Sequence, residues 1–168
     1  MKNIQQIKTI SYLSFKIGKE HFAANVRYVQ NILELTDITE VPKAPDYMLG
    51  IINLRGMVLP LVDMRIKLGL PNTEKTSSTC ILVLEVIIEK QQVFIGALVD
   101  SVSEVLEIDD SNIKDSPGIG NQYKSEFISG VFHDGNKFIL LLEMNNFFSS
   151  SEVILLQEHN MKTEVNGV

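Results

Sequence analysis

The segment from Val41 to Arg65, VPKAPDYMLGIINLRGMVLPLVDMR, contains the clearest structural signal in this chain. Gly50 opens a short apolar run, the residues Asn53-Leu54-Arg55-Gly56 interrupt it, and a second apolar run extends from Met57 to Val62. Two apolar runs of strand length around a break that contains glycine predict a β-hairpin. We expect Arg55 to lie at the tip of this hairpin, where a tight turn can hold its side chain outward.

Composition restricts the class of protein. The chain has 168 residues, of which 45% are hydrophobic, and a formal net charge of -6. Its 15 basic residues are dispersed, whereas nucleic-acid binding requires a concentrated basic face, so we expect no nucleic-acid partner. The apolar runs fall short of the about 20 residues that span a bilayer, and the N-terminal residues lack a secretory signal. Because the single cysteine, Cys80, leaves no disulfide framework, we expect a cytoplasmic protein without membrane insertion.

Further strands are predicted on both sides of the hairpin. Thr9–Ile17 alternates between polar and apolar residues, as a half-buried strand does. Thr79–Ile88 is almost continuously apolar, which indicates a strand buried on both faces, and Val93–Val99 is expected to pair back onto it. Phe127–Met144 predicts another hairpin, with its turn at Asp134-Gly135-Asn136.

Helical spacing is confined to short stretches. Apolar residues recur every three or four positions from Val26 to Leu33, which predicts one short amphipathic helix, and the same spacing recurs from Val102 to Leu106. Asp63–Leu68 is expected to form a helical turn. Ser151 is the expected N-cap of a terminal helix over Glu152–Glu158.

An internal repeat links the two halves of the chain. Residues 47–64 align without a gap over residues 127–144, and residues 25–35 align over residues 98–108. The same order of similar segments in both halves suggests a duplicated unit, although generic strand patterns can also align by chance. Each half is too small to bury much apolar surface alone, so we expect a shared core and a binding groove between the halves.

Many short strands with turn signals favour barrels or sandwiches over helical folds. We therefore expect a mostly β protein that forms one domain over residues 1–168. Its subdomains are expected at residues 20–78 and 79–150, with residues 9–17 able to pair with either, followed by a C-terminal helix and tail at residues 151–168. Two small β-barrels packed side by side, with short helices, fit this pattern.

Four segments resemble the CheW family of bacterial chemotaxis coupling proteins: VPKAPDYMLGIINLRGMVLPLVDMRIKLGL, FKIGKEHFAANVRYVQNIL, GALVDSVSEVLEI and FISGVFHDGNKFILLLEM. The resemblance extends from about Ser11 to Leu156. It implies two SH3-like five-stranded β-barrels, no catalysis and no cofactor. It also implies two partners, namely the regulatory domain of a CheA-type histidine kinase and the helical hairpin tip of a chemoreceptor, and recruitment to receptor arrays at the membrane.

The resemblance also implies where partners bind. The receptor- and coupling-critical positions of the family carry over onto Val29, Gly50 and Arg55. Many members have Glu at the position of Asn31, where it can pair with the arginine, so that Asn31 or Glu34 remains as a candidate partner of Arg55 here. The expected partner-binding residues are Val29, Asn31, Ile32, Gly50, Asn53, Arg55 and Gly56.

Structural explanations compete with each of these roles. Arg55 can be a surface cation without a role, Gly50 and Gly56 can serve only to give the backbone a positive φ, and Val29 and Ile32 can simply pack against their barrel. Asp63 and Asp100 are expected at a helix start and in a loop rather than as a carboxylate pair.

Two other functional classes remain open. The chain can be the CheW-like part of a longer protein with a receiver domain, or a small β-barrel ligand-binding domain or enzyme that uses the groove. Against an enzyme, His21, His133 and His159 lie at no metal-ligand spacing, and Cys80 lies in the most apolar strand, as an inert buried thiol would.

Overall fold

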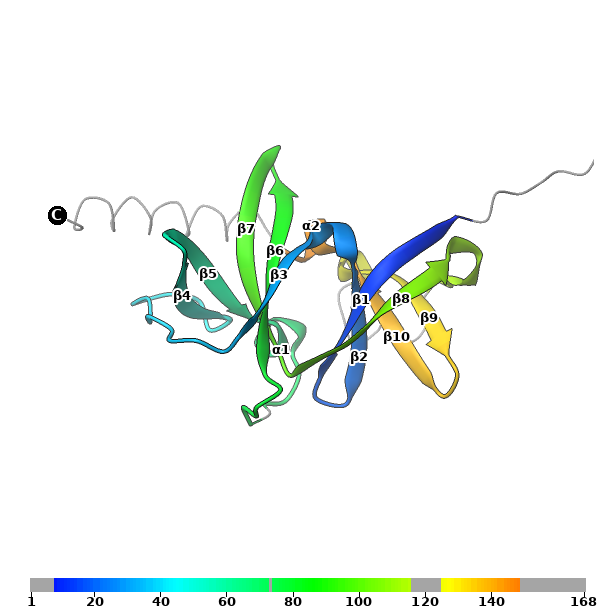
Figure 1. Cartoon of the computed structure of the whole chain (residues 1–168), viewed down its shortest axis with the longest axis horizontal. Coiled ribbons are helices and arrows are strands. Elements are labelled where there is room, and N and C mark those ends of the chain that lie inside the picture. The colour runs from blue at the N-terminus through cyan, green and yellow to red at the C-terminus, as the bar shows by residue number, and fades with distance from the viewer. Residues whose placement is uncertain (1–7, 73, 116–124, 149–168) are drawn as a thin grey trace, which may run out of the picture.

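The computed structural model describes residues 8–72, 74–115 and 125–148. In these residues the strands form two five-stranded sheets, with the orders β8-β1-β2-β10-β9 (sheet A) and β3-β6-β7-β5-β4 (sheet B) (Figure 1). Sheet A contains β1 (Thr9–Ile17), β2 (Glu20–Asn25), β8 (Ser101–Asp109), β9 (Ile128–Asp134) and β10 (Lys137–Leu142). Sheet B contains β3 (Val29–Glu34), β4 (Met48–Leu54), β5 (Met57–Asp63), β6 (Cys80–Ile88) and β7 (Gln91–Val99).

The helical elements are short. They are α1 (Met64–Leu68), α2 (Met144–Phe147) and the 3-10 turns η1 (Val26–Tyr28), η2 (Asp110–Asn112) and η4 (Ser125–Phe127). Asp63 caps α1 at its start and Gly69 ends it in a left-handed conformation, as the sequence predicts. In the described part of the chain no helix is both long and apolar enough to cross a bilayer. The terminal helix expected at Glu152–Glu158 and the tail at residues 151–168 lie outside the described residues.

Each sheet is built from both halves of the chain, so the expected division into residues 20–78 and 79–150 is wrong. The first half contributes β1 and β2 to sheet A and β3, β4 and β5 to sheet B, and the second half does the reverse. The chain crosses between the sheets after β2 and again after β7. Parallel pairing of β2 with β10 and of β5 with β7 joins the halves, and these contacts between distant segments decide which strands share a sheet. Residues 9–17 pair within sheet A.

The internal repeat is confirmed by the topology. The hairpin β4–β5 occupies the place in sheet B that the hairpin β9–β10 occupies in sheet A, and β3 and β8 form the opposite edges. The aligned segments 47–64 and 127–144 are therefore equivalent, as are 25–35 and 98–108. The expected mostly β fold of two side-by-side five-stranded units is also confirmed.

The helix predicted from Val26 to Leu33 is wrong. Only η1 is helical, and β3 begins at Val29, paired with β6. The helix-like spacing has a different cause: the register of β3 shifts by one residue between Val29 and Asn31, so that Val29 and Ile32 occupy the same face three positions apart. A similar bulge in β8 opposes Val102 to Phe15 and Val105 to Leu13, which accounts for the spacing there.

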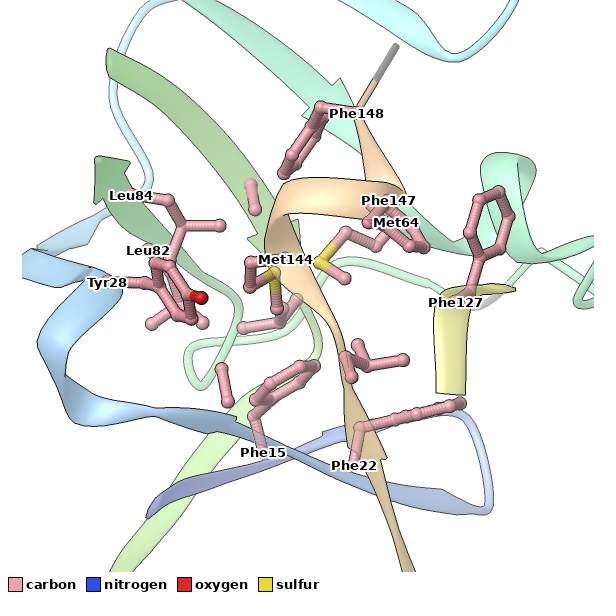
Figure 2. Close-up of a cluster of buried hydrophobic side chains, with 14 of the residues drawn as sticks. Phe15, Phe22, Tyr28, Met64, Leu82, Leu84, Phe127, Met144, Phe147 and Phe148 are labelled. Carbon is pink, nitrogen blue, oxygen red and sulfur yellow. The ribbon is translucent and has the colours of Figure 1, made fainter. Parts of the chain in front are cut away.

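The core confirms that the two halves share buried surface. The largest buried cluster lies between the sheets and combines Phe15 and Phe22 of sheet A with Leu82 and Leu84 of sheet B, together with residues of α1 and α2 (Figure 2). Two smaller clusters lie within sheet B and within sheet A. Alternate residues of β6 serve different clusters, because successive side chains of a strand point to opposite faces. This explains why β6 is apolar on both faces.

Candidate partner-binding site

The tip of the β4–β5 hairpin presents Arg55, as the sequence predicts. Arg55 and Gly56 form a two-residue turn with φ of 52° and 86°. The Oδ1 atom of Asn53 accepts a hydrogen bond from the Gly56 N–H at 2.9 Å, which fixes the turn. The Arg55 side chain is exposed and forms no ion pair with any described residue. The turn therefore displays a guanidinium group that no described side chain pairs with.

The first residues of β3 form a second part of the candidate site. Val29 is half-buried and packs against the core between the sheets, whereas the Ile32 side chain is 46% exposed. The Oδ1 atom of Asn31 accepts a hydrogen bond from the Ile32 N–H at 2.9 Å. The strand thus offers an apolar side chain and polar groups at the edge of sheet B.

Neither candidate partner of Arg55 forms an ion pair or hydrogen bond with it among the described residues. Asn31 bonds locally, and Glu34 belongs to β3, which lies at the opposite end of the strand order from β4. The expected site residues therefore fall into two groups, one on β3 and one at the β4–β5 tip.

Gly50 has a structural role beneath the site. The segment after β3 returns to β4 through paired backbone hydrogen bonds between Thr39 and Ile51, at 2.8 and 2.9 Å. Gly50 is buried with φ of +149°, and a Cβ atom there would collide with the carbonyl of Thr39. Gly50 is thus required for this close backbone approach, and it contributes no side chain to a partner surface.

The structure also brings together two carboxylates that the sequence left apart. Arg65 is buried and lies between them, with Nη2 3.1 Å from Asp63 Oδ2 and Nη1 4.0 Å from Asp100 Oδ1. The backbone N–H groups of Gly18 and Asp100 donate to Asp100 and Lys16 respectively, which ties the crossover after β7 to the β1–β2 turn. Asp63 and Asp100 therefore form an ion cluster with Arg65, a role that requires tertiary contacts and could not be found from spacing.

The space between the sheets is packed, and an open pocket lies at one end of it. This pocket has a volume of about 350 Å³ and lies between the β1–β2 turn and the residues after α1. Within the described ranges, no three His, Cys, Asp or Glu residues gather as a metal site would require. Burial raises the pKa of the Cys80 thiol, which is half-buried in β6 and disfavoured as a thiolate nucleophile. The pocket lining is Ile17, Gly18, Lys19, Glu20, Leu70 and Pro71.

Known proteins are similar to this chain in sequence and in fold. Residues 11–152 match the CheW-like domain family. Chemotaxis protein CheW of Rhizobium meliloti (strain 1021) is 38% identical over 140 residues, which cover 83% of this chain and 88% of that protein. The probable chemotaxis protein CheW of Rhizobium etli is 35% identical with the same coverage. The crystal structure of scaffolding protein TtCheW from Thermoanaerobacter tengcongensis superposes with a TM-score of 0.75 at 24% identity, covering 89% of this chain and 94% of that one.

The resemblance of the four sequence segments to the CheW family is thus confirmed by independent comparisons of sequence and of fold. The matched region includes both sheets, both crossovers and the β4–β5 tip. The chain belongs to the CheW-like domain family, and a chemotaxis coupling scaffold is the function that this membership supports.

Proposed function

We propose that this protein is a non-catalytic scaffold that couples chemoreceptors to a CheA-type histidine kinase. The observation that carries the proposal is the exposure, in a CheW-like fold, of two side chains: the guanidinium group of Arg55, which has no partner among the described residues, and the apolar side chain of Ile32. A scaffold acts through such surfaces. It would work in the cytoplasm and join receptor arrays at the membrane through its partners.

The receptor would bind to the two groups of site residues on sheet B. Its cytoplasmic hairpin tip is helical, and helices end in unpaired carbonyl groups that a planar guanidinium can reach with two donors. Arg55 would supply those donors at the β4–β5 tip, while Val29 and Ile32 would supply apolar contact on β3. Gly50 and Gly56 would contribute by shaping the backbone.

The kinase would bind to the same unit through other exposed side chains. Ile87 near the end of β6 is 60% exposed and Met57 at the start of β5 is 38% exposed. These exposed apolar side chains would form the kinase contact. A standard interface buries about 1,600 Å² in total, but the many contacts of an array allow each one to be weaker.

A binding experiment tests both halves of the proposal. The protein is titrated by calorimetry with the regulatory domain of a histidine kinase from the same organism, and separately with a receptor signalling fragment. We expect both to bind, and a pull-down from the source cell to recover the kinase together with a receptor. Absence of binding to every such kinase domain of the organism would refute the coupling function.

A further inference from the structure

The crossover from β2 to β3 contains a buried tyrosine that directly precedes the receptor-facing strand. Tyr28 is only 8% exposed, and its ring packs among the residues between the sheets, near Leu82 and Leu84 (Figure 2). Its hydroxyl oxygen needs hydrogen-bond partners, because a buried polar group without them is costly. Those partners come from two segments of the chain, the crossover itself and the start of α2.

The Tyr28 hydroxyl group uses its full bonding capacity. It accepts a hydrogen bond from Arg27 Nη2 at 2.8 Å and another from Asn145 Nδ2 at 3.2 Å, and it donates to Glu143 Oε1 at 3.3 Å. The guanidinium group of Arg27 also lies 4.8 Å from the centre of the Tyr28 ring. One hydroxyl thus joins the crossover to the start of α2.

The same network extends into sheet B. Asn145 Oδ1 accepts a hydrogen bond from the backbone N–H of Ile87 at 3.1 Å, beyond the part of β6 that pairs with β3. Because β3 begins with Val29 opposite Leu84 on β6, the network holds both the strand that precedes the site and the strand that supports it. The position of Val29 relative to both sheets is therefore set at this point.

The other crossover uses the equivalent positions in the same way. The repeat aligns Arg27 with Asp100, Asn145 with Arg65 and Glu143 with Asp63. At the second crossover these residues form the ion cluster. There the Gly18 N–H donates to Asp100, the equivalent of Arg27, whereas at the first crossover the Ile87 N–H donates to Asn145, the equivalent of Arg65. Both repeats thus place a cluster of hydrogen-bonded or charged side chains, called here a polar lock, where the chain changes sheets. In the polar lock that precedes β3, the Tyr28 hydroxyl joins Arg27, Glu143 and Asn145.

We propose that Tyr28 is a positioning residue for the receptor site: its hydroxyl group fixes the start of β3, and through it Val29 and Ile32, without touching the receptor. This inference rests on the proposed receptor-binding role of β3. It predicts that loss of the hydroxyl group alone loosens the start of the strand and weakens receptor binding. The fold should persist, because the ring still fills its place in the core.

The test compares Tyr28→Phe with Tyr12→Phe. Tyr12 on β1 is equally buried, at 8% exposure, and its hydroxyl group forms no hydrogen bond to a described residue, so it controls for loss of a buried hydroxyl group. We expect Tyr28→Phe to weaken binding of a receptor signalling fragment about threefold to tenfold and to accelerate hydrogen exchange of the amides from Val29 to Ile32. Tyr12→Phe should leave both unchanged.

A second variant removes a hydrogen-bond partner of Tyr28 and leaves the tyrosine unchanged. Asn145→Ala removes the link between the Tyr28 hydroxyl and the Ile87 N–H, and we expect it to reproduce both effects, with the double variant no worse than Asn145→Ala alone. The proposal is overturned if Tyr28→Phe exchanges and binds like the wild type, or if both tyrosine variants weaken binding equally. If the wild type binds no receptor fragment, the proposed function fails, while the exchange rates still decide the positioning role.

Discussion

The two sheets share one topology but differ at the tips of their hairpins. In sheet A each hairpin turn has a glycine at the position with positive φ, namely Gly18 and Gly135. In sheet B the corresponding turns place charged residues in the left-handed region, namely Arg55, Glu89 and Lys90. Because β5 and β7 are parallel and each follows its turn, these charged tips lie at the same end of sheet B (Figure 1).

This difference indicates that backbone strain is concentrated in the hairpin turns of sheet B. A residue other than glycine in the left-handed region costs of order 1 kcal/mol, and such strain concentrates at functional sites. The repeat shows that glycine fits the turn, since Gly135 stands where Arg55 stands in the other hairpin. We infer that sheet B gives up some stability to display charge, and the following predictions test that inference.

The largest effect is expected from the glycines beneath the two hairpins. Gly50→Ala should destabilise the protein by about 3 kcal/mol or more, because the new methyl group meets a backbone carbonyl at an unfavourable φ. Gly130→Ala, its equivalent in sheet A, meets mainly the Ile113 side chain, which can move, and should cost about 1–3 kcal/mol. Urea unfolding of both variants measures the difference. Equal losses in the free energy of unfolding would show that the two sheets tolerate a side chain at these positions equally well.

The next largest effect is expected on receptor coupling, from substitutions of Arg55 at the β4–β5 tip. Arg55→Ala should leave the fold intact and weaken receptor binding or kinase activation by about 1–3 kcal/mol, the range of a charge-assisted hydrogen bond. Arg55→Lys should restore only part of this, because lysine lacks the planar fork. Receptor-coupled kinase activity and melting temperature are measured on the same samples. Normal coupling by a folded Arg55→Ala variant would contradict the role of this residue.

The residues at the two equivalent hairpin tips, Arg55 and Gly135, can be exchanged. Arg55→Gly should raise the free energy of unfolding by about 0.5–1 kcal/mol while coupling is lost, since it removes strain and charge together. Gly135→Arg should lower stability by about 1 kcal/mol and change no coupling. Thermal unfolding and kinase assays of this pair suffice. A loss of stability in Arg55→Gly would show that the arginine contributes to the fold.

The smallest effect is expected from protonation in sheet A. Burial, reinforced by Lys137 and Lys16, lowers the pKa of His21 from its ordinary value of 6.5. The unfolded chain then binds the proton more readily, so stability should fall as the pH drops through 6.5 toward the lower pKa of the folded state. His21→Gln should remove this part of the pH dependence without changing stability at pH 8. A series of unfolding curves from pH 5 to 8 checks the slope.

Local features of the fold follow from the sequence because they depend on neighbours in the chain. The apolar runs and the glycine at position 56 define the β4–β5 hairpin and place Arg55 at its tip. The Asp63 cap and Gly69 define α1. The spacing of apolar residues from Val26 to Leu33 wrongly predicted a helix, because a bulge in a strand produces the same interval of three residues as a helix turn.

The hairpins, the turn residues, the repeat and the family could thus be predicted from the sequence alone. The division of each half of the chain between the two sheets could not, because parallel pairing of β2 with β10 and of β5 with β7 joins segments far apart in the sequence. The polar contacts at the crossovers depend on tertiary structure as well. Arg65 meets Asp100, and Tyr28 meets Asn145, only after both sheets have formed, and no spacing along the chain encodes contacts of that kind.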